Sequence, residues 1–140
     1  YPSHENHGKM TFNDSRKHES NFTSVRINNN NSIMLSSLEQ LNLGVWISHG
    51  EGKFKLPYPK ENYNIVAEYG YPDYPSNPNG SDYNTAMLSS DDGRHLVTMP
   101  HIERSIFKWN WAYYEDGRDD ILSPWILAFL NAKNWILENS

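Results

Sequence analysis

Cysteine is absent from all 140 residues of the chain. The absence excludes a disulfide framework, a thiolate metal site and a cysteine nucleophile supplied from within these residues. Long apolar runs are absent too, because no stretch approaches the roughly 18 to 20 residues that a membrane-spanning helix needs. The first residues, YPSHENH, have neither the basic nor the apolar region of a signal peptide. We therefore expect a soluble, cytoplasmic protein with no membrane partner.

Clusters of basic residues are also scarce. The 12 Lys and Arg residues are outnumbered by 17 Asp and Glu residues, which gives a formal net charge of -5. The longest basic run is the pair Arg16-Lys17. A nucleic-acid-binding protein uses a basic patch to displace the counterions of the phosphates. The composition therefore predicts no nucleic-acid partner.

The length of the chain suits one domain with a core and is too short for several. It begins at Tyr1 rather than at Met, as in a sequence entered in the middle of a domain. Residues 1–20 are rich in His, Asn and Ser and include Pro2 and Gly8. This composition predicts a loop or a poorly ordered arm.

Alternating and short apolar runs predict four strands, over residues 21–27, 45–47, 54–56 and 63–69. The turn Asp91-Asp92-Gly93 separates the runs 85–89 and 95–99. Asp-Gly supplies the positive φ angles that a tight hairpin needs, so these runs predict a hairpin. Between the fourth strand and this hairpin, residues 70–82 hold three prolines and predict a shaped surface loop.

Helical spacing occurs twice. It covers about two turns over residues 34–41, where the apolar positions are Met34, Leu35, Leu38 and Leu41. The second helix should begin with Ser123 as N-cap and Pro124 at its first position. Its expected buried face consists of Trp125, Phe129, Ala132 and Ile136. The element order predicts a single folding unit of mixed α/β class.

His101 and Glu103 form the sharpest local motif, in Met-Pro-His-Ile-Glu-Arg. They follow the second hairpin strand, and ligands of α/β sheets bind at the ends of strands. A carboxylate that accepts a hydrogen bond from one imidazole nitrogen leaves the other nitrogen free to move a proton. His-x-Glu is a weak pattern, and from the spacing alone a surface His beside a solvated Glu is the favoured interpretation.

Ser48-His49-Gly50-Glu51-Gly52 is a second candidate, because two glycines let the backbone approach a ligand closely. A plain Gly-rich turn is the alternative. A metal site would combine His49, Glu51, His101 and Glu103, but no His-Glu-x-x-His spacing and no Cys ligand support it, so we predict no metal. The aromatic stretch Trp109, Trp111, Tyr113 and Tyr114 predicts packing rather than a ring-binding site.

Several segments carry a resemblance to a known family through their order along the chain. They are Asn13-Asp14-Ser15 with Glu19 and Phe22, the segment 46–52, the segment 74–81, Asp92-Gly93-Arg94, the segment 99–104, and Ser123-Pro124-Trp125 with Asn131-Ala132. In this order they resemble the class I glutamine amidotransferase domain at the C-terminal end of the phosphoribosylformylglycinamidine synthase family. The combination of Ser-His-Gly-Glu-Gly, Asn-Pro-Asn-Gly-Ser and Pro-His-x-Glu-Arg is specific to this family, whereas His-x-Glu alone is shared more widely.

The resemblance implies a flavodoxin-like α/β fold with a mixed sheet and flanking helices. This part of the domain would lack the nucleophile strand and its elbow. Residues 1–140 are then the C-terminal portion of a single glutamine amidotransferase domain. The resemblance implies that His101 is the general acid and base, that Glu103 orients it, and that Ser48, His49 and Gly50 hold glutamine. The family's cysteine lies upstream in a Gly-x-Cys elbow, so this chain should be inactive alone.

The resemblance also implies partners. Ammonia released from glutamine would pass to a separate synthetase domain of the same polypeptide, where ATP and magnesium activate formylglycinamide ribonucleotide in purine biosynthesis. No cofactor is implied in this chain itself. A truncated sheet exposes an unpaired strand and apolar faces, so we expect association, either as a dimer or with the remainder of the synthase polypeptide.

Two alternatives stay open at this point. One is the glutaminase of another class I amidotransferase such as guanylate synthetase, whose corresponding strand also ends in Ser-His-Gly; the Asn-Pro-Asn-Gly-Ser loop argues against it. The other is a non-catalytic interaction module with the amidotransferase fold. Ile102 stands where the family usually has proline, and Lys17 and His18 stand where it usually has arginine and phenylalanine. None of these departures removes a catalytic group.

Overall fold

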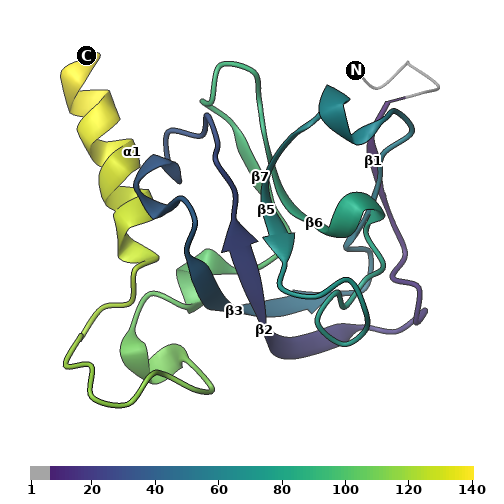
Figure 1. Ribbon diagram of the computed structural model, residues 1–140, viewed down its shortest axis with the longest axis horizontal. Helices are drawn as coiled ribbons and strands as arrows, with labels where there is room; N and C mark the ends of the chain where they lie inside the picture. The colour runs from purple at the N-terminus through teal and green to yellow at the C-terminus, as the bar shows by residue number, and fades with distance from the viewer. Residues whose placement is uncertain (1–6) are drawn as a thin grey trace.

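The computed structural model describes residues 7–140 and contains two antiparallel sheets and one α-helix (Figure 1). The larger sheet has the strand order β3-β2-β5-β6-β7. Its strands are β2 (Glu19–Ile27), β3 (Asn42–His49), β5 (Asn64–Tyr69), β6 (Thr85–Ser89) and β7 (Leu96–Thr98). The smaller sheet pairs β1 (Lys9–Thr11) with β4 (Lys53–Lys55). The helix α1 (Ile126–Glu138) stands at the opposite side of the molecule from β1.

Five short 3-10 turns connect these elements. They are η1 (Ser36–Leu38), η2 (Lys60–Asn62), η3 (Asp82–Asn84), η4 (Ile102–Arg104) and η5 (Lys108–Asn110). The turn η1 packs against α1, and η4 packs against β3. Among residues 7–140, no helix combines the length and the apolarity that crossing a bilayer takes.

The antiparallel pairing corrects the expectation of a mixed sheet with flanking helices. Every ladder among residues 7–140 is antiparallel. A parallel pair needs a crossover of about a dozen or more residues between its strands, usually a helix. Helix α1 follows the last strand and therefore connects no two strands. The predicted strands and the hairpin of β6 and β7 are confirmed.

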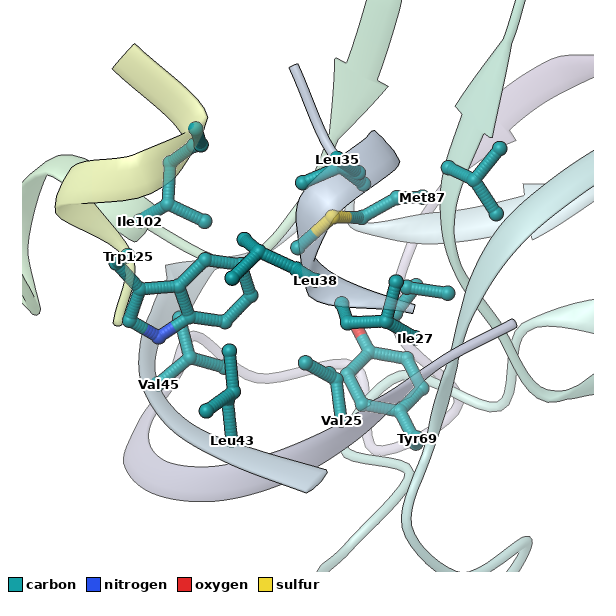
Figure 2. Close-up of a cluster of buried hydrophobic side chains, with 14 of the residues drawn as sticks. Val25, Ile27, Leu35, Leu38, Leu43, Val45, Tyr69, Met87, Ile102 and Trp125 are labelled. Carbon is teal, nitrogen blue, oxygen red and sulfur yellow. The ribbon is translucent and has the colours of Figure 1, made fainter. Parts of the chain in front are cut away.

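The core lies on one face of the larger sheet, under η1 and the start of α1, and Figure 2 shows most of it. Alternation places Val25 and Ile27 of β2 on this face, and both are fully buried. Val25 is opposite Leu43 on one neighbouring strand and opposite Tyr69 on the other, so three strands contribute to one packed layer. Trp125 closes the layer from the helix side.

The helix predicted over residues 34–41 is replaced by the single turn η1. Leu35 and Leu38 are fully buried, as the spacing predicted. The backbone, however, reverses at Gln40, which has a φ of 67°. The Gln40 amide then donates to the Ile27 carbonyl, and the Ile27 amide donates to the Leu41 carbonyl, each at 2.9 Å. These bonds to β2 replace the bonds that would continue a helix.

The arm predicted over residues 1–20 is wrong where strands form, residues 12–18 are a loop as predicted, and residues 1–6 lie outside the described residues. Strand β1 forms within it, and β2 already begins at Glu19. Met10 is opposite Phe54 and packs against a second apolar cluster of Phe54, Leu56 and Ile65. One apolar side chain in a polar segment was enough to anchor a short strand, because a partner strand offered a buried surface.

Helix α1 is confirmed, but its predicted boundary is not, and of its predicted buried face only Trp125 is fully buried. It begins at Ile126 with Trp125 at the N-cap, and it buries Ala128 rather than Phe129. Phe129 and Ile136 are 36% and 58% exposed. The Trp125 indole Nε1 donates to the Gly44 carbonyl at 2.8 Å, which sets the rotation of the helix against β3. Leu127, Leu130 and Leu137 are also exposed, so apolar residues cover the outer side of α1.

Candidate active site

His101 is held against β3 by its backbone. Its amide donates to the Trp46 carbonyl at 2.7 Å, which forms a single antiparallel bridge between the two residues. The Ser105 hydroxyl donates to the His101 carbonyl at 3.2 Å and accepts from the Trp46 amide at 3.2 Å. These bonds place His101 at the start of η4, beside the end of β3 that leads to Ser48. They also occupy the outer edge of β3, so the expected unpaired strand is covered there.

The His101 ring forms a close pair with Glu103, as the two-residue spacing predicted. Nδ1 of His101 lies 2.6 Å from Oε1 of Glu103, and the two side chains are 27% and 54% exposed. A carboxylate only accepts hydrogen bonds, so Nδ1 is the donor, and Nε2 is the nitrogen that remains for moving a proton. Arg104 Nε lies 3.8 Å from the same carboxylate oxygen. Glu103 is thus held between two basic groups.

Ser48 and His49 end β3 opposite the start of β2. Ser48 is paired in register with Ser20, and His49 with Glu19. The Ser48 hydroxyl lies 3.1 Å from Nε2 of His18. The antiparallel ladder therefore gathers three polar side chains, His18, Ser48 and His49, at one end of the sheet, next to the residue that bridges to His101.

Asn13 is the residue that positions the His49 loop, and it is completely buried. Its Nδ2 donates to the His49 carbonyl at 2.7 Å, and its Oδ1 accepts from the Gly52 amide at 3.1 Å. The same Oδ1 lies 3.1 Å from His49 Nδ1, and the Asn13 amide donates to the Gly50 carbonyl at 2.9 Å. One side chain and its own backbone thus bind three residues of the loop.

Asn79 supports the loop from the other side and is also completely buried. Its Nδ2 donates to the Gly52 carbonyl at 2.7 Å and to the Tyr69 hydroxyl at 3.1 Å. Its Oδ1 accepts from the amide and the hydroxyl of Ser81 at 3.0 and 2.7 Å. Burial, opposed by the bond from Asn79, raises the pKa of the Tyr69 hydroxyl. The Asn-Pro-Asn-Gly-Ser segment therefore acts as a support for the glycine loop.

Sequence reasoning missed the roles of Asn13 and Asn79. Both lie in segments that carry the family resemblance, and that position along the chain was the signal available. The chain contains many asparagines, and composition does not separate a buried asparagine from an exposed one. Burial is decided by strands that lie far away in the sequence.

The His49 ring is enclosed. Burial lowers the pKa of His49 below its ordinary 6.5, and the nearby His18 and His101 act in the same direction, whereas a backbone hydrogen bond and Glu19 oppose the change. Nε2 is buried without a hydrogen-bond partner. A Cβ atom on Gly52 would lie 2.5 Å from the ring, so only glycine lets the loop pack on it. His49 is therefore neutral, with its proton on Nδ1 toward Asn13.

The lowered pKa of His49 has a consequence for stability. We expect the free energy of unfolding to fall as the pH drops below 6.5, because unfolded His49 takes up a proton there while the native ring stays neutral. The free energy of unfolding stops falling for this reason once the pH is below the pKa of His49 in the native state. Urea unfolding of the chain and of His49→Gln between about pH 5 and pH 7.5 measures it. The variant should show the smaller pH dependence, and identical dependences would contradict the assignment.

Other candidate residues are not brought together with this site. Glu51 is exposed. Among residues 7–140, no group of three or more His, Asp or Glu side chains is arranged to hold a metal ion. In the aromatic stretch, Trp111 packs on Phe22 and donates its indole N–H to the Ser105 carbonyl at 2.7 Å. Trp109 and Tyr113 are exposed.

Comparison with known proteins places the chain in a family. Residues 2–136 match the sequence model of the CobB/CobQ-like glutamine amidotransferase domain. The chain is 40% identical over 144 residues to phosphoribosylformylglycinamidine synthase of Homo sapiens, a match that covers 94% of this chain and 11% of the human protein. The synthase of Drosophila melanogaster is 39% identical over 147 residues. The chain thus spans about a tenth of the length of these relatives.

A solved structure has the same fold. PurLQS from Thermotoga maritima superimposes with a TM-score of 0.70 over 92% of this chain and 53% of that chain, at 23% sequence identity. At this identity the likeness concerns the fold alone. The family match, by contrast, extends over nearly all residues of the chain. The chain belongs to the family of CobB/CobQ-like glutamine amidotransferase domains.

Proposed function

We propose that this chain carries the acid–base half of a glutaminase site, in which His101 is the general acid and base and Glu103 orients it. The observation that carries the proposal is the 2.6 Å contact between His101 Nδ1 and Glu103 Oε1. That contact selects the tautomer with a bare Nε2, which is the form that accepts a proton. The family to which the chain belongs supplies the reaction class, transfer of the amide nitrogen of glutamine.

The nucleophile comes from outside these 140 residues, since they contain no cysteine. In the proposed reaction, His101 Nε2 takes the proton of that thiol, and the sulfur attacks the side-chain amide carbon of glutamine. The tetrahedral intermediate collapses, and His101 returns the proton to the leaving ammonia. Water, deprotonated by His101, then attacks the glutamyl thioester and releases glutamate and the thiol.

Ser48, His49 and Gly50 hold the α-amino and α-carboxylate groups of glutamine in this proposal. Two features support a binding role for this turn. Asn13 and Asn79 fix its backbone by hydrogen bonds of 2.7 Å to the His49 and Gly52 carbonyls. The space beside the Gly50 Cα is open, because a Cβ atom there would meet nothing within 4 Å. A rigid turn with an open flank suits the close approach of a small polar ligand.

The finer assignment is the glutaminase of the phosphoribosylformylglycinamidine synthase type. The identity of 40% to the human enzyme supports it. In this proposal the chain is the C-terminal portion of a flavodoxin-like amidotransferase domain, and a further segment provides the nucleophile strand and elbow. The exposed leucines of α1 support a covering partner of this kind, or a second copy of the chain. ATP and magnesium bind to a separate synthetase domain, which uses the ammonia to convert formylglycinamide ribonucleotide.

Reconstitution tests the proposal. We expect no glutamate release from glutamine by the chain alone, and release when it is combined with the segment that carries the Gly-x-Cys elbow, because only then are thiol and imidazole together. An enzymatic glutamate assay measures both. The matched control carries serine in place of that cysteine and should be inactive.

Three other outcomes decide against parts of the proposal. Glutamate release by the isolated chain would overturn the external nucleophile. A folded but inactive combination would favour an interaction module that has kept the fold. In a protein that also includes the synthetase domain, absence of glutamine-dependent amidation of formylglycinamide ribonucleotide would favour another amidotransferase, such as guanylate synthetase.

A further inference from the structure

The small sheet presents a basic outer face. Side chains alternate along a strand, so Met10 of β1 and Phe54 of β4 point into the second apolar cluster. The opposite face of the same two strands carries Lys9, Thr11, Lys53 and Lys55. Lys9 is directly opposite Lys55 in the ladder. Like charges directly opposite each other destabilise a sheet. An anion bound on this face would reduce the repulsion between the two lysines.

These side chains line a hollow of about 450 Å³ beside the turn that follows β1. Its basic residues are Lys9, Arg16, Lys53 and Lys55, and its acidic residue is Asp14. The hollow therefore gathers four of the 12 basic residues of a chain whose net charge is -5. Asp14 is paired with Lys53 at 2.5 Å, which leaves the other three cations without an acidic partner among residues 7–140.

Arg16, in the turn that follows β1, has an uncommon backbone conformation. Arg16 has a φ of 58°, in the left-handed region that non-glycine residues rarely adopt, and its amide donates to the Asn13 carbonyl at 3.0 Å. Its guanidinium lies over the Phe12 ring, 5.9 Å from the centroid, and Phe12 itself is exposed. Strain of this kind persists where the surroundings impose it, and it clusters at ligand sites.

We propose that this hollow binds a small phosphate-bearing molecule, with Lys9, Arg16 and Lys55 as its cationic donors. A phosphate group accepts several charge-assisted hydrogen bonds at once, and three cations from two strands and a turn converge on one space. The volume falls in the range of small-molecule sites. The acidic chain as a whole repels a long polyanion, so a compact phosphate ester fits the arrangement better than a nucleic acid.

The hollow shares a residue with the candidate active site. Asn13 lines the hollow, while its side chain holds the His49 carbonyl and the Gly52 amide. A ligand bound in the hollow should therefore change the surroundings of the Gly52 amide through Asn13. The binding proposal itself does not depend on glutaminase activity, because it is tested without glutamine.

Titration of the 140-residue chain with ribose 5-phosphate at low ionic strength, followed by NMR and calorimetry, tests the proposal. We expect saturable one-to-one binding with a Kd of roughly 1 mM or lower. The affinity should fall as salt is added. The amide signals of Asn13 and Gly52 should shift with the same Kd. Inorganic phosphate should compete for the site, and ribose should not.

The variant Lys9→Gln/Lys55→Gln should weaken binding by at least about tenfold, because it removes two of the donors. It also removes the opposed lysine pair, so its thermal unfolding temperature should be no lower than that of the parent chain. The matched control is Lys17→Gln/Lys133→Gln, which removes the same charge at two exposed positions outside the hollow and should bind normally.

Three results would overturn the proposal. One is absence of saturation by ribose 5-phosphate up to about 10 mM. Another is equal weakening in both variants, which would show attraction by net charge alone. The third is binding of an oligoglutamate peptide in the hollow with no binding of the phosphate ester, which would assign the surface to an acidic polypeptide.

Discussion

His101→Ala should abolish glutamine-dependent synthesis and leave ammonia-dependent synthesis intact in a protein that joins this chain to the cysteine-bearing segment and the synthetase domain. The expected loss with glutamine is about 10²- to 10⁴-fold, the usual contribution of a positioned acid or base. The expectation rests on the proposed function. Ammonia bypasses the step that needs the imidazole, so the synthetase domain works normally when ammonia is supplied. Initial rates with each nitrogen donor measure the two activities.

The matched control for this prediction is His95→Ala. His95 is exposed in the hairpin next to β7, and the same substitution there removes an imidazole outside the site. We expect both nitrogen donors to support normal rates in that variant. Equal loss of both activities in His101→Ala would assign His101 a structural role and remove it from the reaction. A glutamine-specific loss in His95→Ala would contradict the assignment of the acid–base role to His101.

Asn79→Ala should cost about 3 kcal/mol of the free energy of unfolding, the largest effect on stability that we expect from one substitution. The amide of Asn79 makes four hydrogen bonds. Its removal leaves the Ser81 amide without its acceptor, and it leaves the Gly52 carbonyl with only the 3.5 Å contact from the Ser81 hydroxyl. A buried group that loses its partner costs about 1 to 3 kcal/mol. Denaturation by urea, followed by tryptophan fluorescence, measures the change.

Asn134→Ala provides the comparison, since Asn134 is exposed on α1. Its effect should stay within about 0.5 kcal/mol, because a surface substitution in a helix breaks no buried bond. Amide hydrogen exchange adds a local test. Gly52 should exchange faster in Asn79→Ala than in the parent chain. A cost below about 1 kcal/mol for Asn79→Ala would mean that water or a neighbouring group replaces the amide.

Secondary structure followed from the sequence where local patterns decide it. The alternation in β2 and the Asp-Gly turn of the β6–β7 hairpin are local signals, and both predicted elements formed. The prediction was wrong over residues 34–41 because helical spacing only requires that leucines point one way. A 3-10 turn followed by a reversal at Gln40 also buries Leu35 and Leu38. The bonds to Ile27 that select the reversal come from another strand.

The candidate site also combines features that local spacing predicts with features that depend on distant segments. A spacing of two residues lets His101 and Glu103 meet, and the structure has them 2.6 Å apart. Their roles, and those of Ser48, His49 and Gly50, stay predictions. Asn13 and Asn79 could not be identified as supports, because their partners on the loop 49–52 are tens of residues away along the chain. The function of a buried polar residue depends on its hydrogen-bond partners. A local sequence pattern does not show partners that lie on distant strands.

The sequence by itself determined that the nucleophile of a cysteine-dependent glutaminase is missing from these residues, because composition is independent of folding. It also determined the strands and the histidine–glutamate pair, which depend on near neighbours. Only the tertiary structure decided which asparagines are buried, which side of α1 is exposed and that every ladder among residues 7–140 is antiparallel. It also brought Lys9, Arg16 and Lys55 together at one hollow, although no basic cluster exists along the chain. Each of these depends on contacts between distant segments, which arise only when the chain has packed.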